Sequence, residues 1–244
     1  MRILSFASGN VWRWSAEKNR AGPLRFLYKL DISGVEITFS KKEELYSFKL
    51  NSKQIKWLKS FDYVSIHAPF KLVRRADNEK EIFKQLEYIA KIYKLVNAKN
   101  VIIHAKDLPA RRILARYKMN FSTENTVKKG KRFVGKRIGI RELARILKKN
   151  PKLGLCLDVA HAYFWGRNET RNLIKKFKKR ITQVHLSGNY RKHDHVSMKI
   201  VSREFMRSIK PIFGLDVPII IEEDMKIKNI KKLKAEIAHI KSLF

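Results

Sequence analysis

The sequence predicts a single (β/α)8 barrel that spans residues 1–244. Three observations support this fold class. Strand-like apolar segments alternate with longer helical segments, about eight such units fit the chain length, and no internal repeat or Pro/Gly/Ser-rich linker divides the chain. The main alternative is an open, doubly wound parallel sheet. The lack of a glycine-rich phosphate loop that opens a helix weakens this alternative.

Eight short segments rich in apolar and β-branched residues are expected to form the strands. Several of them are apolar throughout, as is typical of strands that are buried on both faces. In chain order these segments are 2–8, 34–39, 63–69, 100–105, 120–126, 153–160, 181–187 and 217–223.

Helical segments are expected between the strands. The clearest covers 79–98, where Ile82, Leu86, Ile89 and Ile92 recur at the spacing of one helix face. The same apolar periodicity predicts four more helices, over 139–150, 170–179, 202–213 and 229–244.

Net charge is the most unusual property of the composition. The chain has 55 Lys and Arg residues against 22 Asp and Glu residues, which gives a formal net charge of +33. A domain this basic should attract polyanions, nucleic acid first and anionic membrane surfaces second. A single lysine-rich segment such as 175–180 can equally be a solvated helix face. The net charge of +33 is harder to explain by solvated helix faces alone, because a solvated surface usually mixes both signs of charge.

Several classes of protein are disfavoured by the composition. One cysteine, Cys156, excludes an intrachain disulfide framework and an all-cysteine zinc site. No apolar run is long enough to span a membrane, and the first residues lack the apolar segment and cleavage signal of a secretory peptide. We therefore expect a soluble, cytoplasmic protein that does not bind a membrane.

Residue types that bind metal ions occupy the ends of the predicted strands. In a barrel these strand ends open on one face, so the residues should converge on one pocket. Imidazole and carboxylate ligands without thiolate suit zinc, manganese or iron, and their number predicts more than one ion. The candidate ligands are His67, His104, Glu124, Asp158, His161, His185, His193, His195 and Glu222.

A structural explanation exists for each candidate ligand taken alone. A single histidine at a strand end is usually a satisfied structural residue, and a single carboxylate often caps the next helix. The joint pattern favours metal, because burying several carboxylates and imidazoles together is costly unless cations compensate. Within the segment 193–195, an extended backbone would point His193 and His195 the same way and Asp194 the other way.

These residues resemble the endonuclease IV family, the zinc-dependent apurinic/apyrimidinic endonucleases among the xylose-isomerase-like barrels. The resemblance runs in family order from about residue 63 to residue 223. It is carried by HAPF at 67–70, ENT at 124–126, LCLDVAHAY at 155–163, HLS at 185–187, H-x-H at 193–195 and PIIIE at 218–222.

The resemblance implies a cluster of up to three zinc ions, with manganese as an alternative metal. Glu124 would bridge the first and second ions. The implied ligand sets are His67, His104 and Glu124 for the first ion, Asp158, His185 and Glu222 for the second, and His161, His193 and His195 for the third. The family usually has an aspartate where this chain has His193, so the choice between His193 and Asp194 stays open.

The activity implied by the resemblance is base excision repair, in which a phosphodiester of damaged duplex DNA is hydrolysed on the 5′ side of an abasic site. Glu124 and Glu222 would be the catalytic carboxylates, Glu124 by bridging two metals and Glu222 by orienting the attacking water. Basic and aromatic residues in loops after the strands would contact the DNA, with Phe70 as an aromatic wedge. These residues are Phe70, Lys71, Arg74, Lys106, Arg167 and Lys192.

Two other functions fit parts of the same pattern. The first is a one-metal isomerase or epimerase of a sugar or sugar phosphate, for which Glu124, Asp158, His185 and Glu222 would supply the metal ligands. The remaining histidines and the +33 charge are surplus to such a site. The second is a basic nucleic-acid-binding module that has lost its metals. The nearly intact set of candidate ligands argues against this function.

Overall fold

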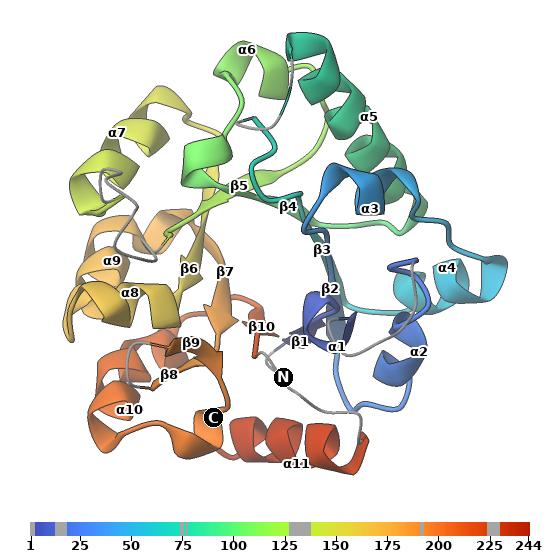
Figure 1. Ribbon diagram of the computed structural model, residues 1–244. Coiled ribbons are helices and arrows are strands. Elements are labelled where there is room, and N and C mark those ends of the chain that lie inside the picture. Colours follow the sequence, from blue (N-terminus) through green and yellow to red (C-terminus); the bar gives the residue numbers. More distant parts are fainter. Residues whose placement is uncertain are drawn as a thin grey trace.

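Eight parallel strands close into a barrel in the computed structural model, and the helices surround it (Figure 1). The structure describes residues 3–12, 19–73, 76, 78–126, 138–190, 193–223 and 230–244. Around the barrel the strand order is β1-β10-β7-β6-β5-β4-β3-β2. The predicted (β/α)8 barrel is therefore confirmed, and the open doubly wound sheet is excluded, because such a sheet would leave two edge strands unpaired.

The barrel strands coincide with the eight predicted strand segments. Each observed strand lies inside its predicted segment and ends one or more residues earlier. The barrel strands are β1 (Leu4–Ala7), β2 (Gly34–Thr38), β3 (Tyr63–His67), β4 (Asn100–His104), β5 (Phe121–Glu124), β6 (Gly154–Asp158), β7 (Ile181–Leu186) and β10 (Ile219–Ile221).

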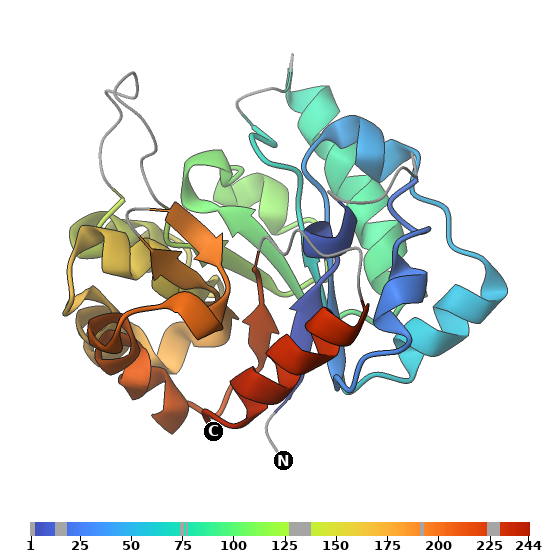
Figure 2. The same cartoon turned by 60° about the horizontal axis from the view of Figure 1, so that its bottom comes forward.

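The five predicted helices are also present. They are α5 (Glu79–Leu95), α7 (Ile140–Lys149), α9 (Glu169–Phe177), α10 (Arg203–Ile209) and α11 (Ile230–Lys241). Helix α10 is shorter than its predicted range of 202–213. Pro211 has no amide hydrogen to continue the helical pattern, and the chain turns into the 3₁₀ helix η4 (Lys210–Gly214). Figure 2 shows α11 crossing beside β10 and β1.

Shorter elements were not predicted. They are α1 (Gly9–Trp12), α2 (Leu24–Leu27), α3 (Lys42–Tyr46), α4 (Ser52–Lys59), α6 (Arg111–Leu114), α8 (Val159–Trp165), the 3₁₀ helices η1 (Ala105–Asp107), η2 (Lys178–Arg180) and η3 (Met198–Ile200), and the strands β8 (Gly188–Tyr190) and β9 (His193–Val196). Helix α4 had a readable signal, because Asn51 and Gln54 form a capping box. Strands β8 and β9 form an antiparallel hairpin after β7.

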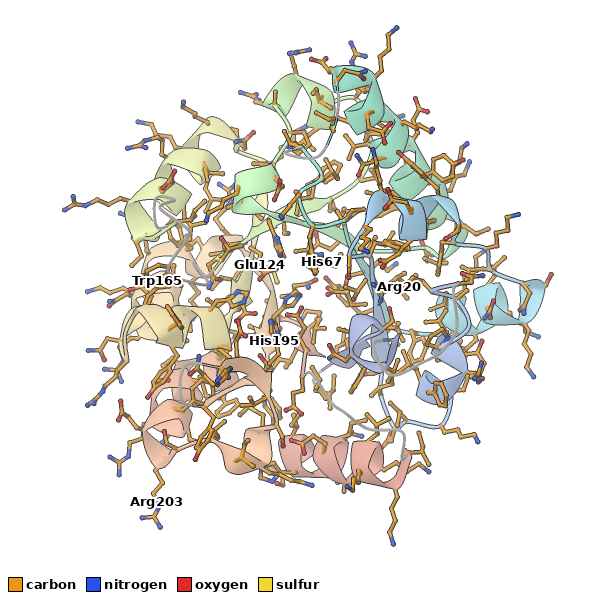
Figure 3. All side chains as sticks on the ribbon, viewed as in Figure 1. Arg20, His67, Glu124, Trp165, His195 and Arg203 are labelled. Atoms are coloured by element: carbon orange, nitrogen blue, oxygen red, sulfur yellow. The ribbon has the colours of Figure 1, made fainter. Side chains whose placement is uncertain are left out.

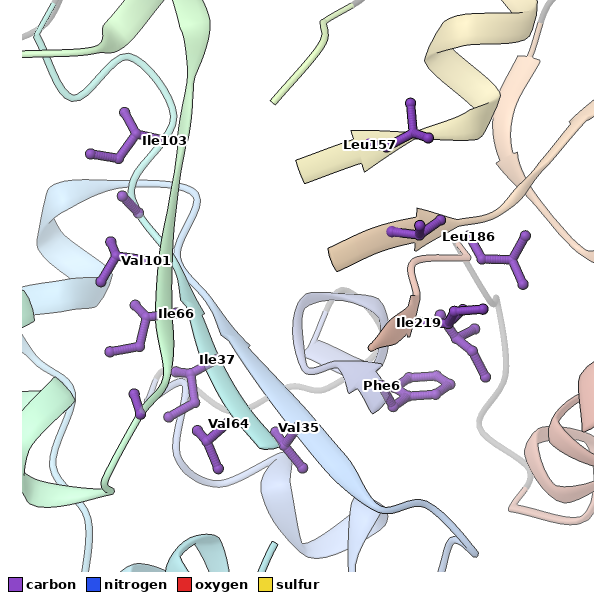
Figure 4. Close-up of a cluster of buried hydrophobic side chains, with 14 of the residues drawn as sticks. Phe6, Val35, Ile37, Val64, Ile66, Val101, Ile103, Leu157, Leu186 and Ile219 are labelled. Atoms are coloured by element: carbon purple, nitrogen blue, oxygen red, sulfur yellow. The ribbon is translucent and has the colours of Figure 1, made fainter. Parts of the chain in front are cut away.

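The strands bury apolar side chains on their outer side and mainly polar side chains inside the barrel. In β3, Val64 and Ile66 belong to the large apolar cluster shown in part in Figure 4. The alternate residues of the same strand, Tyr63, Ser65 and His67, bond to side chains of other strands across the interior. Since successive residues of a strand face opposite sides, the polar residues of β3 point toward the barrel axis. None of the described helices is long and apolar enough to cross a membrane.

Gly34 gives a direct test of the packing between β1, β2 and β3. A Cβ atom at this position would lie 2.6 Å from the carbonyl oxygen of Tyr63 and 3.0 Å from the Cβ of Ser5. Gly34→Ala should therefore lower the free energy of unfolding by about 1–3 kcal/mol, the usual cost of overpacking. Urea unfolding measures this change. The control is Gly214→Ala, where the added Cβ meets no atom within 4 Å, and equal stability of the two variants would contradict the packing described here.

Candidate metal centre

The candidate ligands lie together at the carboxyl ends of the barrel strands. Strand pairing sets neighbouring ligands beside each other: His104 is opposite Glu124, and Asp158 is opposite His185. Figure 3 shows His67, Glu124 and His195 close to the middle of the ring of strands. The convergence that the sequence predicted from a barrel is therefore what the topology produces.

Four overlapping groups of side chains in the described part of the chain have the geometry to hold a metal ion. Within each group the nitrogen and oxygen ligand atoms lie within 4.8 Å of one another. Glu124, Asp158 and His161 each belong to two groups. The groups are His67, His104 and Glu124; Glu124, Asp158 and His161; Asp158, His185 and Glu222; and His161, Asp194 and His195. Eight of the nine residues predicted as ligands are members.

The first group gathers two imidazoles around Glu124. The Oε2 atom of Glu124 is 3.2 Å from Nε2 of His67 and 3.5 Å from Nε2 of His104. Burial lowers the pKa of His104 to about 4, so this imidazole is neutral at pH 7 and can bind a metal through nitrogen. The ring of Phe70 is stacked on His104 at a centroid distance of 5.0 Å and meets the edge of His67 at 5.2 Å. Phe70, predicted as a DNA wedge, thus packs on two candidate ligands.

The second group contains three buried ligand atoms without a hydrogen bond of good geometry in the described structure. These atoms are Oδ2 of Asp158, Nδ1 of His185 and Oε2 of Glu222. The nitrogen of His185 is 2.8 Å from the oxygen of Glu222, the distance of an ion pair. A divalent cation that displaces the proton between them would find both atoms and the free oxygen of Asp158 beside it, so the second group fits such an ion.

Backbone carbonyls fix the orientation of three candidate histidines. The Nδ1 atom of His67 is 2.9 Å from the oxygen of Ala68, that of His161 is 2.9 Å from the oxygen of Asn125, and that of His195 is 2.8 Å from the oxygen of Glu222. A proton on Nδ1 completes each bond and leaves Nε2 with a free lone pair. These contacts therefore select the tautomer in which Nε2 binds the metal.

Glu36 belongs to the site and was missed by the sequence prediction. Its Oε2 atom lies 3.2 Å from Nε2 of His185, on the side of the ring away from the second group. Ser65 and Gln183 each donate a hydrogen bond of 2.9 Å to the same oxygen. A carboxylate in this position holds the ring of a metal-binding histidine and raises its basicity. The available signal was a carboxylate in the middle of the otherwise apolar strand 34–39.

The third group corrects one predicted ligand. His193 is exposed and lies outside the four groups, whereas the side chain of Asp194 is almost buried. The Oδ2 atom of Asp194 is 3.6 Å from Nε2 of His161 and 3.9 Å from Nε2 of His195. The alternation rule fails here because His195 has a φ of 57°, in the left-handed region. Asp194 and His195 therefore face the same side, and Asp194, the alternative left open by the sequence, is the residue that lies in the candidate group.

Without metal, the buried imidazoles and carboxylates balance one another by sharing protons. Burial disfavours the charged forms of His161 and His185. Surrounding carboxylates outweigh this effect at His161, and Cys156 together with Glu36 and Glu222 outweighs it at His185, so both pKa values lie well above the ordinary value. Burial also opposes ionisation of Glu222, yet His185 and His195 lower its pKa to about 2. Burial raises the pKa of Asp158 to about 6. A metal ion must displace protons from this centre in order to bind.

Four of the residues predicted to contact DNA are described, and they follow β3, β4 and α8: Phe70, Lys71, Lys106 and Arg167. Lys71 and Lys106 are half-buried, and Arg167 is exposed and paired with Glu204. Arg74 and Lys192 lie outside the described residues. Their role in binding DNA stays a prediction.

A family model described as the xylose isomerase-like TIM barrel matches residues 63–243. The chain belongs to this family. No curated protein sequence matches the chain.

Solved structures with several chemistries share the fold of this xylose isomerase-like barrel. The probable 3-DHS dehydratase AsbF from Bacillus anthracis is 15% identical, with a TM-score of 0.71 and 99% of each chain covered. D-allulose 3-epimerase from Methylomonas sp. is 13% identical, with a TM-score of 0.69, and 100% of this chain and 98% of that chain are covered. Endonuclease IV from Thermus thermophilus is 18% identical, with a TM-score of 0.67, and 98% of this chain and 99% of that chain are covered. At these identities the likeness concerns the fold alone.

Adjacent substitutions distinguish Asp194 from His193 as the metal ligand. We expect Asp194→Ala to lose about one equivalent of bound zinc per chain, because a ligand set reduced to two imidazoles holds the ion weakly. His193→Ala, the matched control in the same strand, should keep the full metal content. Elemental analysis of protein purified without chelator measures both. Loss of metal from the His193 variant alone would restore the original assignment.

Glu36→Gln tests the carboxylate behind His185. The substitution keeps the size of the side chain but removes its charge, so we expect metal affinity to fall by about 10–100-fold. Competition with a fluorescent chelator measures the affinity. Glu236→Gln is the control, since Glu236 is also buried but hydrogen-bonds to the amide of Met198, away from His185. An equal effect of both substitutions would mean that Glu36 does not act through His185.

Proposed function

We propose that this barrel is a metal-dependent phosphodiester hydrolase that cleaves damaged DNA on the 5′ side of abasic sites with up to three zinc ions. The observation that carries the proposal is the extent of the ligand array. The Glu124, Asp158 and His161 group shares one residue with each of the other three groups, so the candidate ligands form one connected array.

The shared carboxylates favour neighbouring ions over a single one. Glu124 belongs to the group with His67 and to the group with Asp158, and it has two oxygens to offer. Three divalent ions would bring about +6, and the four carboxylates Glu124, Asp158, Asp194 and Glu222 about −4, which leaves about +2. A centre with this net charge suits a phosphodiester better than a neutral sugar.

The residues of the centre can be given specific roles in hydrolysis. Bound divalent ions would supply Lewis-acid stabilisation of the phosphate and a lowered pKa for water. Glu222 is ionised, since its pKa is about 2, and its Oε2 atom lies 2.8 Å from Nδ1 of His185. An ionised carboxylate at this place can accept a hydrogen bond from the attacking water and orient it. Glu36 holds the ring of His185 through its Nε2 atom, and the Nδ1 atom of the same ring contacts Glu222.

Basic and aromatic side chains near the centre suit a DNA substrate. Lys71 and Lys106 follow β3 and β4, and Phe70 lies directly on His104. Beyond α8, a pocket of about 640 Å³ is lined by Arg167 together with Tyr163, Phe164, Trp165 and Tyr190. Aromatic rings beside a guanidinium group form a surface on which bases can stack. With a net charge of +33, DNA binding should weaken steeply as salt is raised.

A one-metal sugar isomerase or epimerase is the second candidate function. Glu124, Asp158, His185 and Glu222 meet at the centre of the array and would complete a one-metal site by themselves. In that case His67, His104 and His161 would contact the substrate instead of a metal. The fold is also that of D-allulose 3-epimerase from Methylomonas sp..

Cleavage of a labelled duplex with one abasic-site analogue tests the proposal. The protein loaded with zinc should cut the strand once, 5′ of the lesion, and leave an intact duplex uncut. Glu222→Gln should lower the rate constant about 100-fold or more, because the carboxylate that orients water is lost. His193→Ala, which changes a residue outside the four groups, should cut at the original rate.

The opposite pattern would favour sugar chemistry. Absence of cleavage with zinc or manganese, together with interconversion of ketose epimers by the same preparation, would overturn the hydrolase proposal. The Glu222→Gln substitution should then abolish epimerisation, since Glu222 would serve as a metal ligand in either reaction.

A further inference from the structure

A second pocket lies at the opposite end of the barrel from the metal centre. It has a volume of about 320 Å³ and is formed where β3, β4, β5, β6 and β7 begin. Ligand pockets in proteins usually span about 300–1,000 Å³, so this one has room for a small molecule. In a barrel enzyme this end normally serves stability, and the proposed hydrolase reaction makes no use of it.

Four cationic side chains line this pocket, and its lining contains no carboxylate. They are Lys99, Lys152, Lys179 and Arg180. Within the described residues, none of the four forms an ion pair. Arg180 instead donates hydrogen bonds to the backbone carbonyls of Asn150 and Leu153, which hold the guanidinium in place without neutralising it. The result is a concentration of uncompensated positive charge in a concave site.

The buried side of the pocket is polar and tightly built. Asn100, which is only 3% exposed, donates to Thr182 at 3.2 Å and accepts from Ser122 at 3.0 Å. Gly154 makes room for this arrangement, since a Cβ at that position would lie 2.4 Å from Thr182 and 2.5 Å from Ser122. Because these polar groups bond to one another, the floor is held in place and the cations around it are the groups left to bind an anion.

We propose that this pocket binds the phosphate groups of a small molecule, a pyrophosphate or a nucleoside polyphosphate. The four uncompensated cations supply the charge for more than one phosphate group. A concave site of this size favours a small ligand over the flat contact that a duplex would make.

Isothermal titration calorimetry of the full chain with pyrophosphate and with adenosine triphosphate tests this proposal. We expect one binding site per chain that Lys99→Ala, Lys152→Ala and Lys179→Ala together weaken by about tenfold or more, equivalent to about 1.4 kcal/mol. The matched control carries Lys53→Ala, Lys80→Ala and Lys234→Ala, three exposed lysines outside this pocket. It has the same change in net charge and should bind like the unmodified protein.

A metal centre can bind phosphate as well, so a third variant separates the two sites. Glu124→Gln changes the metal centre and should leave pyrophosphate binding at the second pocket intact. This expectation holds whether or not the barrel cleaves DNA. Equal affinity of the two triple-lysine variants would show that binding follows net charge alone and would overturn the proposal. Loss of binding in the Glu124 variant, or no binding of either compound to the unmodified protein, would also overturn the proposal.

Discussion

The hydrogen-bond register of the closed parallel barrel is the constraint on which the candidate site depends. Pairing of β4 with β5 sets His104 opposite Glu124, and pairing of β6 with β7 sets Asp158 opposite His185. A shift of one residue in any of these strands would turn its ligand outward among the apolar residues that face the helices. The outer apolar cluster therefore fixes the register, and the register gathers ligands from residues 67 to 222.

Inside the barrel, polar contacts link the two ends of the molecule. Asn100 and Tyr63 both donate to Oε1 of Gln183, at 3.3 and 2.7 Å, and Gln183 donates to Glu36, which contacts His185. Polar groups buried at this density are tolerated because they satisfy one another. At the candidate metal centre the pattern changes, since imidazoles and carboxylates face each other in close pairs, such as His185 and Glu222 at 2.8 Å. A divalent cation can take the place of the protons that these groups share.

The sequence predicted the strands and most residues of the candidate centre because each depends on a local pattern. Apolar β-branched runs mark the strands, and a polar residue at the end of such a run marks a site in a barrel. Glu36 escaped this rule because it lies in the middle of its strand and acts across the barrel on His185. Asp194 replaced His193 because the left-handed backbone at His195 breaks the alternation of side chains. Neither a contact across the barrel nor a single φ angle can be read from residue spacing.

Anomalous diffraction at the zinc edge, from crystals grown with zinc, tests the multinuclear centre most directly. The account predicts three peaks, one beside His67 and His104, one beside Asp158 and His185, and one beside Asp194 and His195, with Glu124 close to the first two. A single peak enclosed by Glu124, Asp158, His185 and Glu222 would contradict it. The outer histidines would then be substrate or structural residues, and the barrel would be equipped for one-metal chemistry.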